Sequence, residues 1–104
     1  MKRLALVILL LLANAAVAQE AEPDYRSDMP KPVVAFVERY EKCNHWAGEE
    51  SYDAARGKYI DQQWKKNRCE ELRPDLEKLK ASYKDNNAVQ TNLDKMVKDY
   101  DWLP

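Results

Sequence analysis

The side chains best suited to chemistry gather between Cys43 and Asp53. This segment, CNHWAGEESYD, holds the single histidine of the chain, one of its two cysteines and three carboxylic acids. Imidazole, thiolate and carboxylate groups bind transition metals or transfer protons, whereas indole and phenol rings provide contact area at interfaces. The segment is therefore the place to look for a catalytic site, a metal site or a binding surface.

Catalysis has the least support among these three. His45 is a suitable base, but the sequence places no serine or free cysteine as its nucleophile. Glu49 and Glu50 are adjacent, so on a regular element their carboxylates diverge rather than flank a substrate. Chains of this size also rarely enclose a pocket of roughly 300 Å³ or more. We expect no enzymatic activity and no cofactor.

A metal-handling or thiol-redox function is the alternative that stays open, and it would use Cys43 and His45. Together with nearby carboxylates they suit zinc or copper if the thiol stays reduced. However, C-x-H is not a standard spacing for structural zinc, and nothing in the sequence obviously lowers a thiol pKa.

A binding surface is the interpretation that we favour. Trp46 and Tyr52 would serve as aromatic anchors, His45 as a titratable polar contact, and the acids would select a cationic protein or peptide. A purely structural role is the competing interpretation: the rings cover the core, and the acids compensate a helix dipole and pair with Arg56. The predicted binding residues are His45, Trp46, Glu49, Glu50, Tyr52 and Asp53.

The first 18 residues have the pattern of a cleavable signal peptide. Lys2 and Arg3 precede an unbroken apolar run, residues 4–12, and Ala16-Val17-Ala18 forms a cleavage site. The run is shorter than the roughly 20 residues that span a bilayer. We expect cleavage after Ala18, a periplasmic or secreted protein, and no membrane span after cleavage.

The charge of the remaining chain gives no reason to expect nucleic acid as a partner. Removing Lys2 and Arg3 from the 17 basic residues leaves 15, against 18 acidic residues. Nucleic-acid binding usually requires a basic patch or stripe. The mild acidic excess is instead compatible with a cationic partner.

An intramolecular disulfide between Cys43 and Cys69 is expected, because export leads to an oxidising compartment and only one such pairing exists. A reactive thiol pair, a metal pair and an intermolecular bridge stay open. The bond excludes a tight hairpin of the first two helices, in which Cys69 would lie roughly 20 Å from Cys43. The loop would then run back along the bundle, or the second helix would cross the first steeply.

Apolar spacing predicts an all-α fold, a small bundle of three or four short helices. We expect a flexible arm at 19–29 and a single helical domain at 30–104. Ser51 is the expected cap of the second helix, and a kinked continuous helix through Pro74 is an alternative. The C-terminal residues 102–104 should fold back. The expected helices are 30–43, 51–71, 74–83 and 87–100.

The segment from Cys43 to Cys69 resembles a group of small exported proteins of Gram-negative bacteria. The shared pattern is C-x-H-W-x-G-E-E-x-Y-D-x-x-R followed by a second cysteine. This resemblance implies a periplasmic setting and no activity. A weaker similarity, to exported helical proteins that resemble lysozyme inhibitors, implies an inhibitor-like form of binding. The residues that carry it are Cys69, Leu72, Asp75, Leu76, Leu79 and Tyr83.

Overall fold

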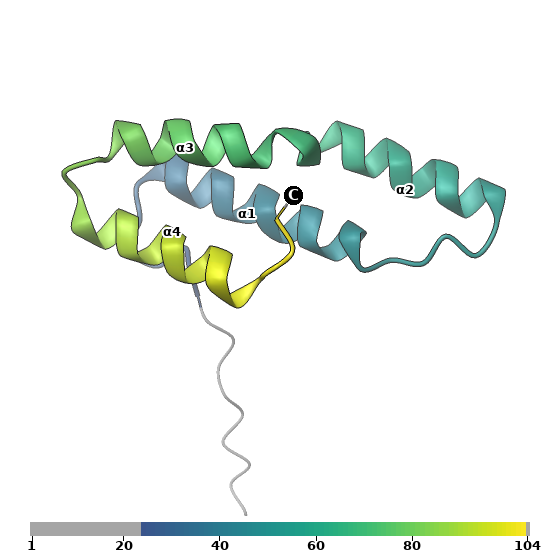
Figure 1. Ribbon diagram of the computed structural model, residues 1–104, viewed down its shortest axis with the longest axis horizontal. Helices are drawn as coiled ribbons and strands as arrows, with labels where there is room; N and C mark the ends of the chain where they lie inside the picture. Colours follow the sequence, from purple (N-terminus) through teal and green to yellow (C-terminus); the bar gives the residue numbers. More distant parts are fainter. Residues whose placement is uncertain (1–23, 104) are drawn as a thin grey trace, which may run out of the picture.

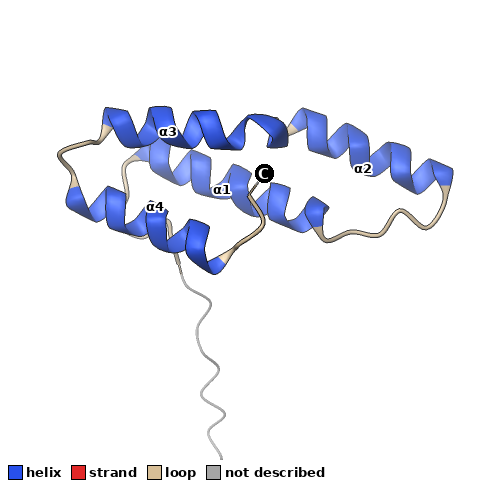
Figure 2. Cartoon of the chain, in the orientation of Figure 1, coloured by secondary structure: helices blue, strands red, loops and turns tan. Residues whose placement is uncertain are grey.

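The computed structural model describes residues 24–103, and this part of the chain is all-α without strands (Figure 2). The proposed signal peptide and residues 19–23 of the expected arm lie outside the described residues. None of the described helices is long and apolar enough to cross a membrane. The helices are α1 (Lys31–Ala47), α2 (Ala54–Lys66), α3 (Leu72–Ser82) and α4 (Asn87–Asp99), with a short 3₁₀ helix, η1 (Cys69–Glu71).

The expected bundle is confirmed, and the core is built from α1, α3 and α4. In Figure 1, α3 runs antiparallel to α1 and α4 lies beside them. Pro32 lies in the first turn of α1, where a missing N–H costs nothing. The predicted apolar stripes of the first and last helices are both buried. The core residues on these three helices are Val33, Phe36, Val37, Tyr40, Cys43, Leu72, Leu76, Val89, Leu93 and Met96.

The disulfide between Cys43 and Cys69 is present, with a Cα–Cα distance of 5.5 Å, and both residues are fully buried. The expected course of the loop is wrong. Residues 48–53 extend beyond the end of α1, and α2 returns along the same line as α3 (Figure 1). The loop thus spans the distance from Cys43 to the start of α2, and α2 does not need to cross α1 steeply. As a consequence, α2 has no buried residue.

The second helix ends at Lys66 rather than at Glu71, because the chain turns sharply at Arg68. Arg68 has left-handed backbone angles, φ 51° and ψ 47°. A non-glycine residue costs roughly 1–2 kcal/mol in this conformation. The continuous helix is therefore excluded, and the third helix begins two residues before Pro74, at Leu72.

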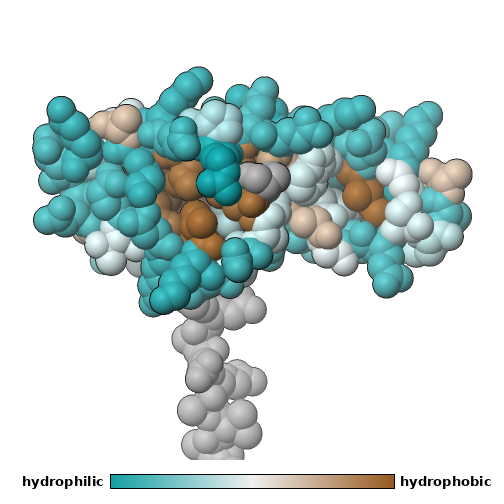
Figure 3. All heavy atoms as spheres, viewed as in Figure 1, coloured by the Kyte–Doolittle hydropathy of each residue, from teal (hydrophilic) through white to brown (hydrophobic). Residues whose placement is uncertain are grey.

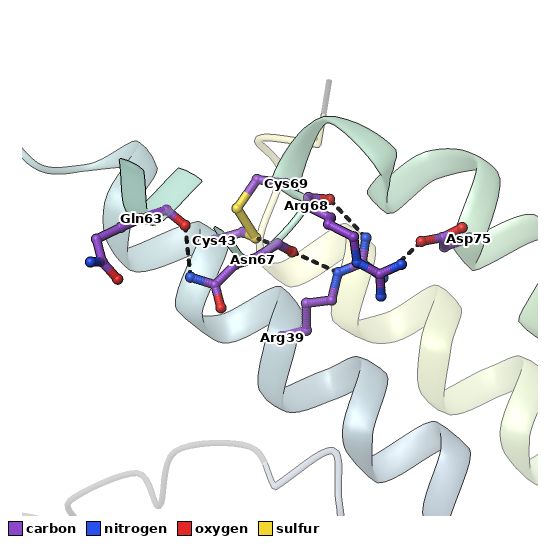
Figure 4. The surroundings of a disulfide bond; sticks show 7 residues. All are labelled: Arg39, Cys43, Gln63, Asn67, Arg68, Cys69 and Asp75. Carbon is purple, nitrogen blue, oxygen red and sulfur yellow. Dashed lines mark hydrogen bonds and ion pairs between the residues drawn. A yellow bond between two sulfur atoms is a disulfide. The ribbon is translucent and has the colours of Figure 1, made fainter. Parts of the chain in front are cut away.

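Arg39 of α1 holds this turn beside the disulfide (Figure 4). Its Nε donates to the carbonyl oxygen of Asn67 at 2.8 Å, and Nη2 donates to that of Arg68 at 2.7 Å. Nη1 lies 2.8 Å from the Asp75 carboxylate of α3. One guanidinium thus satisfies carbonyls at the end of α2 and joins α1 to α3.

Within the described part of the arm expected at 19–29, Tyr25 is 2% exposed and belongs to the core. The Tyr25 hydroxyl donates to the Asp99 carboxylate, and Asn92 Nδ2 donates to the Tyr25 carbonyl oxygen at 2.7 Å. Both partners lie on α4. Residues 24–29 are therefore attached to the last helix through Tyr25. The mostly polar composition of this segment gave no indication of this contact.

The C-terminal tail folds back as expected over its described residues. The Tyr40 hydroxyl donates to the carbonyl oxygen of Tyr100 at 2.9 Å, and the Trp102 ring contacts both Tyr40 and Trp64. At the other end of α4, the side chain of Asn86 caps the helix by accepting the backbone N–H of Val89. Gln90 donates to carbonyls of Lys80 and Tyr83 at the end of α3.

Reduction of the disulfide should lower the free energy of unfolding by about 3.5 kcal/mol, because the bridge closes a loop between residues 26 apart. Urea denaturation of the same protein with and without reductant measures the effect and leaves every side chain in place. Alkylation of the reduced form prevents reoxidation. A loss below about 1 kcal/mol would show that the packing around the bridge, rather than the covalent link, holds α1 to η1.

Stability should also fall as the pH rises from about 10 to about 12. Burial raises the pKa of Tyr40 to about 12, and burial together with the Asp99 hydrogen bond raises the pKa of Tyr25. Unfolded tyrosine loses its proton near pH 10, so the unfolded state gains stability first. Urea midpoints at pH 9 and 11 should differ less in Tyr40→Phe, whereas Tyr52→Phe, at a 75% exposed ring, should retain the full difference.

Candidate functional site

The predicted binding residues are divided between the last turn of α1 and the loop after it. α1 continues to Ala47 rather than ending near Cys43, so His45 and Trp46 are helical. The helix ends at Gly48, whose N–H donates back to carbonyls of the last turn. Residues 44–47 contain no helix breaker, which is why the helix runs on to the glycine. We call the whole region, residues 45–59, the α1–α2 end.

Aromatic rings from both helices meet at the α1–α2 end. The Trp46 ring lies edge-on to His45, at 4.8 Å between centres, and to Tyr59 of α2, at 5.5 Å. Trp46 is half-buried, whereas Tyr52 and Tyr59 are 75% and 45% exposed. Tyr59 therefore faces this cluster and solvent, whereas Trp64, further along α2, packs against the core.

Arg56 lies at the centre of this cluster. Its guanidinium carbon is 5.7 Å from the ring centre of Trp46, 5.9 Å from that of Tyr52 and 5.7 Å from that of Tyr59. Its Nη2 donates to Glu49 Oε2 at 2.7 Å. Cation–π attraction acts within about 6 Å of a ring centre, so all three rings contribute. Arg56 thus joins α2 to the last turn of α1 and to the loop.

The three acids of the segment have three different environments. Glu49 is paired on both oxygens, with Arg56 on one side and His45 Nε2 at 3.4 Å on the other. Asp53 caps α2 by accepting the backbone N–H of Arg56 at 2.7 Å, which corrects the expectation that Ser51 is the cap. Glu50 is exposed and has no ion pair within residues 24–103. Only Glu50 offers an uncompensated charge.

The sequence interpretation missed Arg56 and Tyr59 as members of the site. Arg56 was expected to pair with acids three positions away, but its carboxylate partner is Glu49, seven residues earlier. The aromatic pattern of α2 contained the signal for Tyr59, and its assignment to the core concealed it. At Gly57 the chain is closely packed, since a Cβ there would lie 2.5 Å from Ser51 Oγ.

Shallow hollows adjoin α1, and one of them borders the α1–α2 end. One, of about 390 Å³, borders His45 and Trp46 on the side of α1 that carries Glu41 and Lys42. Another, of about 490 Å³, lies between α1 and α3 and is bordered by Arg39 and Asp75, which pair with each other. Within the described residues, no group of three or more His, Cys, Asp or Glu side chains is arranged to hold a metal ion.

Comparison of the chain with protein-family models, curated proteins and solved structures yields no match.

Glu49→Gln should destabilise the protein by about 1 kcal/mol, because it removes the anion from a partly shielded pair with Arg56. Glu50→Gln is the matched control, since it makes the same chemical change one residue away at a carboxylate with no ion pair. Thermal and urea unfolding of the two variants measure the difference. Equal effects would mean that the Glu49–Arg56 pair contributes nothing to holding α2 against α1.

Proposed function

We propose that this protein is a non-catalytic binding protein of the periplasm, which recognises a cationic protein or peptide through the α1–α2 end. The observation that carries the proposal is the position of α2. This helix extends past the core (Figure 1) and has no buried residue, so Tyr59 lies on the surface beside Trp46 rather than inside the fold.

Exposed aromatic rings support a contact surface. Tyr52 and Tyr59 are the exposed large hydrophobic residues among those described. Tyr59 lies beside Trp46, and Tyr52 contacts the Arg56 guanidinium that also contacts Trp46. In Figure 3 an apolar area over α2 is separate from the larger one between α3 and α4. Tyrosine and tryptophan are enriched among the residues that dominate binding energy at protein interfaces. Their gathering at one end favours binding there over a purely structural role.

The charge of the same surface supports a cationic partner. Residues 45–56 contain three carboxylates and one guanidinium. Glu50 is unpaired, and Glu49 stays partly exposed, with 32% of its side-chain surface accessible. Complementary charge of this kind mainly sets the rate and the specificity of association. A basic segment of a partner would therefore approach this end in preference to neutral surfaces.

The alternative metal-handling or thiol-redox function has less support. Cys43 and Cys69 are joined and fully buried, which removes the thiol that such a function would use. His45 lies two residues from Cys43 on α1, and its side chain is 59% exposed and directed to Glu49. Positions two apart on a helix face different directions, so the two side chains do not converge.

Trp46→Ala, and the double substitution Glu49→Lys/Glu50→Lys, should each reduce capture of a cationic partner from periplasmic extract at least tenfold. The first removes the central ring and the second reverses the charge of the surface. Glu77→Lys, a charge reversal at an exposed position of α3, should leave capture unchanged. Quantitative mass spectrometry of the captured proteins at low and high salt provides the measurement.

Far-ultraviolet circular dichroism of each variant distinguishes lost binding from lost structure. Unchanged capture by both variants would contradict the proposal. Unfolding of both would favour the structural role of the aromatic cluster.

A further inference from the structure

The surroundings of Arg56 have the composition of a site for a cation. Three rings stand 5.7–5.9 Å from its guanidinium carbon, and Glu49 accepts one of its N–H groups. Aromatic cages completed by a carboxylate recognise alkylammonium and guanidinium groups, because the ring faces and the carboxylate are both negative. In the free protein the cation inside this cage belongs to the chain itself.

Arg56 does not form all the hydrogen bonds that a guanidinium in this cage could form. Its Nε is buried and has no hydrogen-bond partner among the described residues. Its ion pair with Glu49 uses Oε2, while the other carboxylate oxygen lies 3.4 Å from His45 Nε2. A guanidinium that approaches a carboxylate freely forms two parallel hydrogen bonds. Arg56 is attached to the first turn of α2, and its backbone N–H is bonded to the Asp53 cap, so its approach to Glu49 is restricted.

The cage is also accessible from outside. Tyr52 is 75% exposed, Tyr59 is 45% exposed, and the His45 side chain is 59% exposed. A side chain from a partner can therefore reach the rings without movement of the backbone. Arg56 itself has 25% of its side-chain surface accessible, and its long stem allows the guanidinium to rotate outward toward solvent.

We propose that the group recognised in the partner is an arginine side chain, which replaces Arg56 against Trp46 and Glu49. The inference rests on the proposed function and adds that Arg56 is an internal competitor for the same site. A cage that Arg56 occupies cannot bind the partner. The apparent affinity for the partner therefore equals the intrinsic affinity multiplied by the fraction of molecules in which Arg56 has left the cage. Removing the Arg56 guanidinium should therefore strengthen binding.

The test compares the wild type with Arg56→Gln, and uses acetyl-Gly-Arg-Gly-amide as the probe at low ionic strength. NMR titration followed at the Trp46 indole N–H gives the affinity. We expect binding at least roughly tenfold tighter in Arg56→Gln. The citrulline peptide, which has the same shape without the charge, should not bind. Adding Glu49→Gln to Arg56→Gln should remove the gain.

The variant should retain its fold, because the Asp53 cap uses the backbone of residue 56 and the disulfide holds the far end of α2. The wild type offers a second measurement that needs no substitution. As the arginine peptide binds, the Arg56 Nε–H resonance should shift toward the position of a solvated arginine. A resonance that stays unchanged while the Trp46 signal saturates would overturn the replacement of Arg56.

The outcomes also separate this inference from the proposed function. Weaker or equal binding of the arginine peptide by Arg56→Gln, or equal binding of the citrulline peptide, would overturn the inference alone. Arg56 would then be part of the contact surface rather than a competitor. Capture of the partner that is insensitive to Trp46→Ala and to the double charge reversal would overturn the proposed function itself.

Discussion

The covalent link between Cys43 and Cys69 is the constraint on which the arrangement of this protein depends. It fixes the start of η1 against α1, four residues before α1 ends at Ala47. The 25 residues between the two cysteines must leave and return to one place. They do so as a loop that extends outward and a helix that comes back along the line of α3 (Figure 1). No residue of α2 is then fully buried: Trp64 packs at the edge of the core, and Tyr59 packs against Trp46 in the last turn of α1.

The same link explains which helices the sequence could predict. Helices α1 and α4 each have an apolar stripe that the bundle core covers, as apolar spacing predicts. The spacing predicts the second helix equally well, yet Tyr59 of α2 is 45% exposed. Periodicity shows that a helix has an apolar face but not what covers it. Which element covers that face depends on a segment distant in sequence, and in this protein the disulfide determines where that segment lies.

The break after α2 shows a second limit of sequence interpretation. No glycine or proline marks Asn67 or Arg68, and Arg68 nevertheless adopts left-handed angles. The conformation is stabilised by Arg39, which is 28 and 29 residues away from the two carbonyls that it binds. Such a contact has no signature in local composition. Sequence analysis placed the disulfide correctly but could not identify the arginine beside it that turns the chain toward α3.

In the predicted site, a count of the acidic residues overestimates the charge available to a partner, because some of the carboxylates bind groups of the same chain. Of the three acids expected to attract a cationic partner, Asp53 is used by the cap of α2 and Glu49 by Arg56, which leaves Glu50 as the unpaired charge. The same internal pairing is informative, because it reveals which cation the surroundings of Trp46 accept. The outer end of α2 is held by this cluster and by its cap rather than by core burial, because α2 has no buried residue. A surface that must release one guanidinium to accept another benefits from that position.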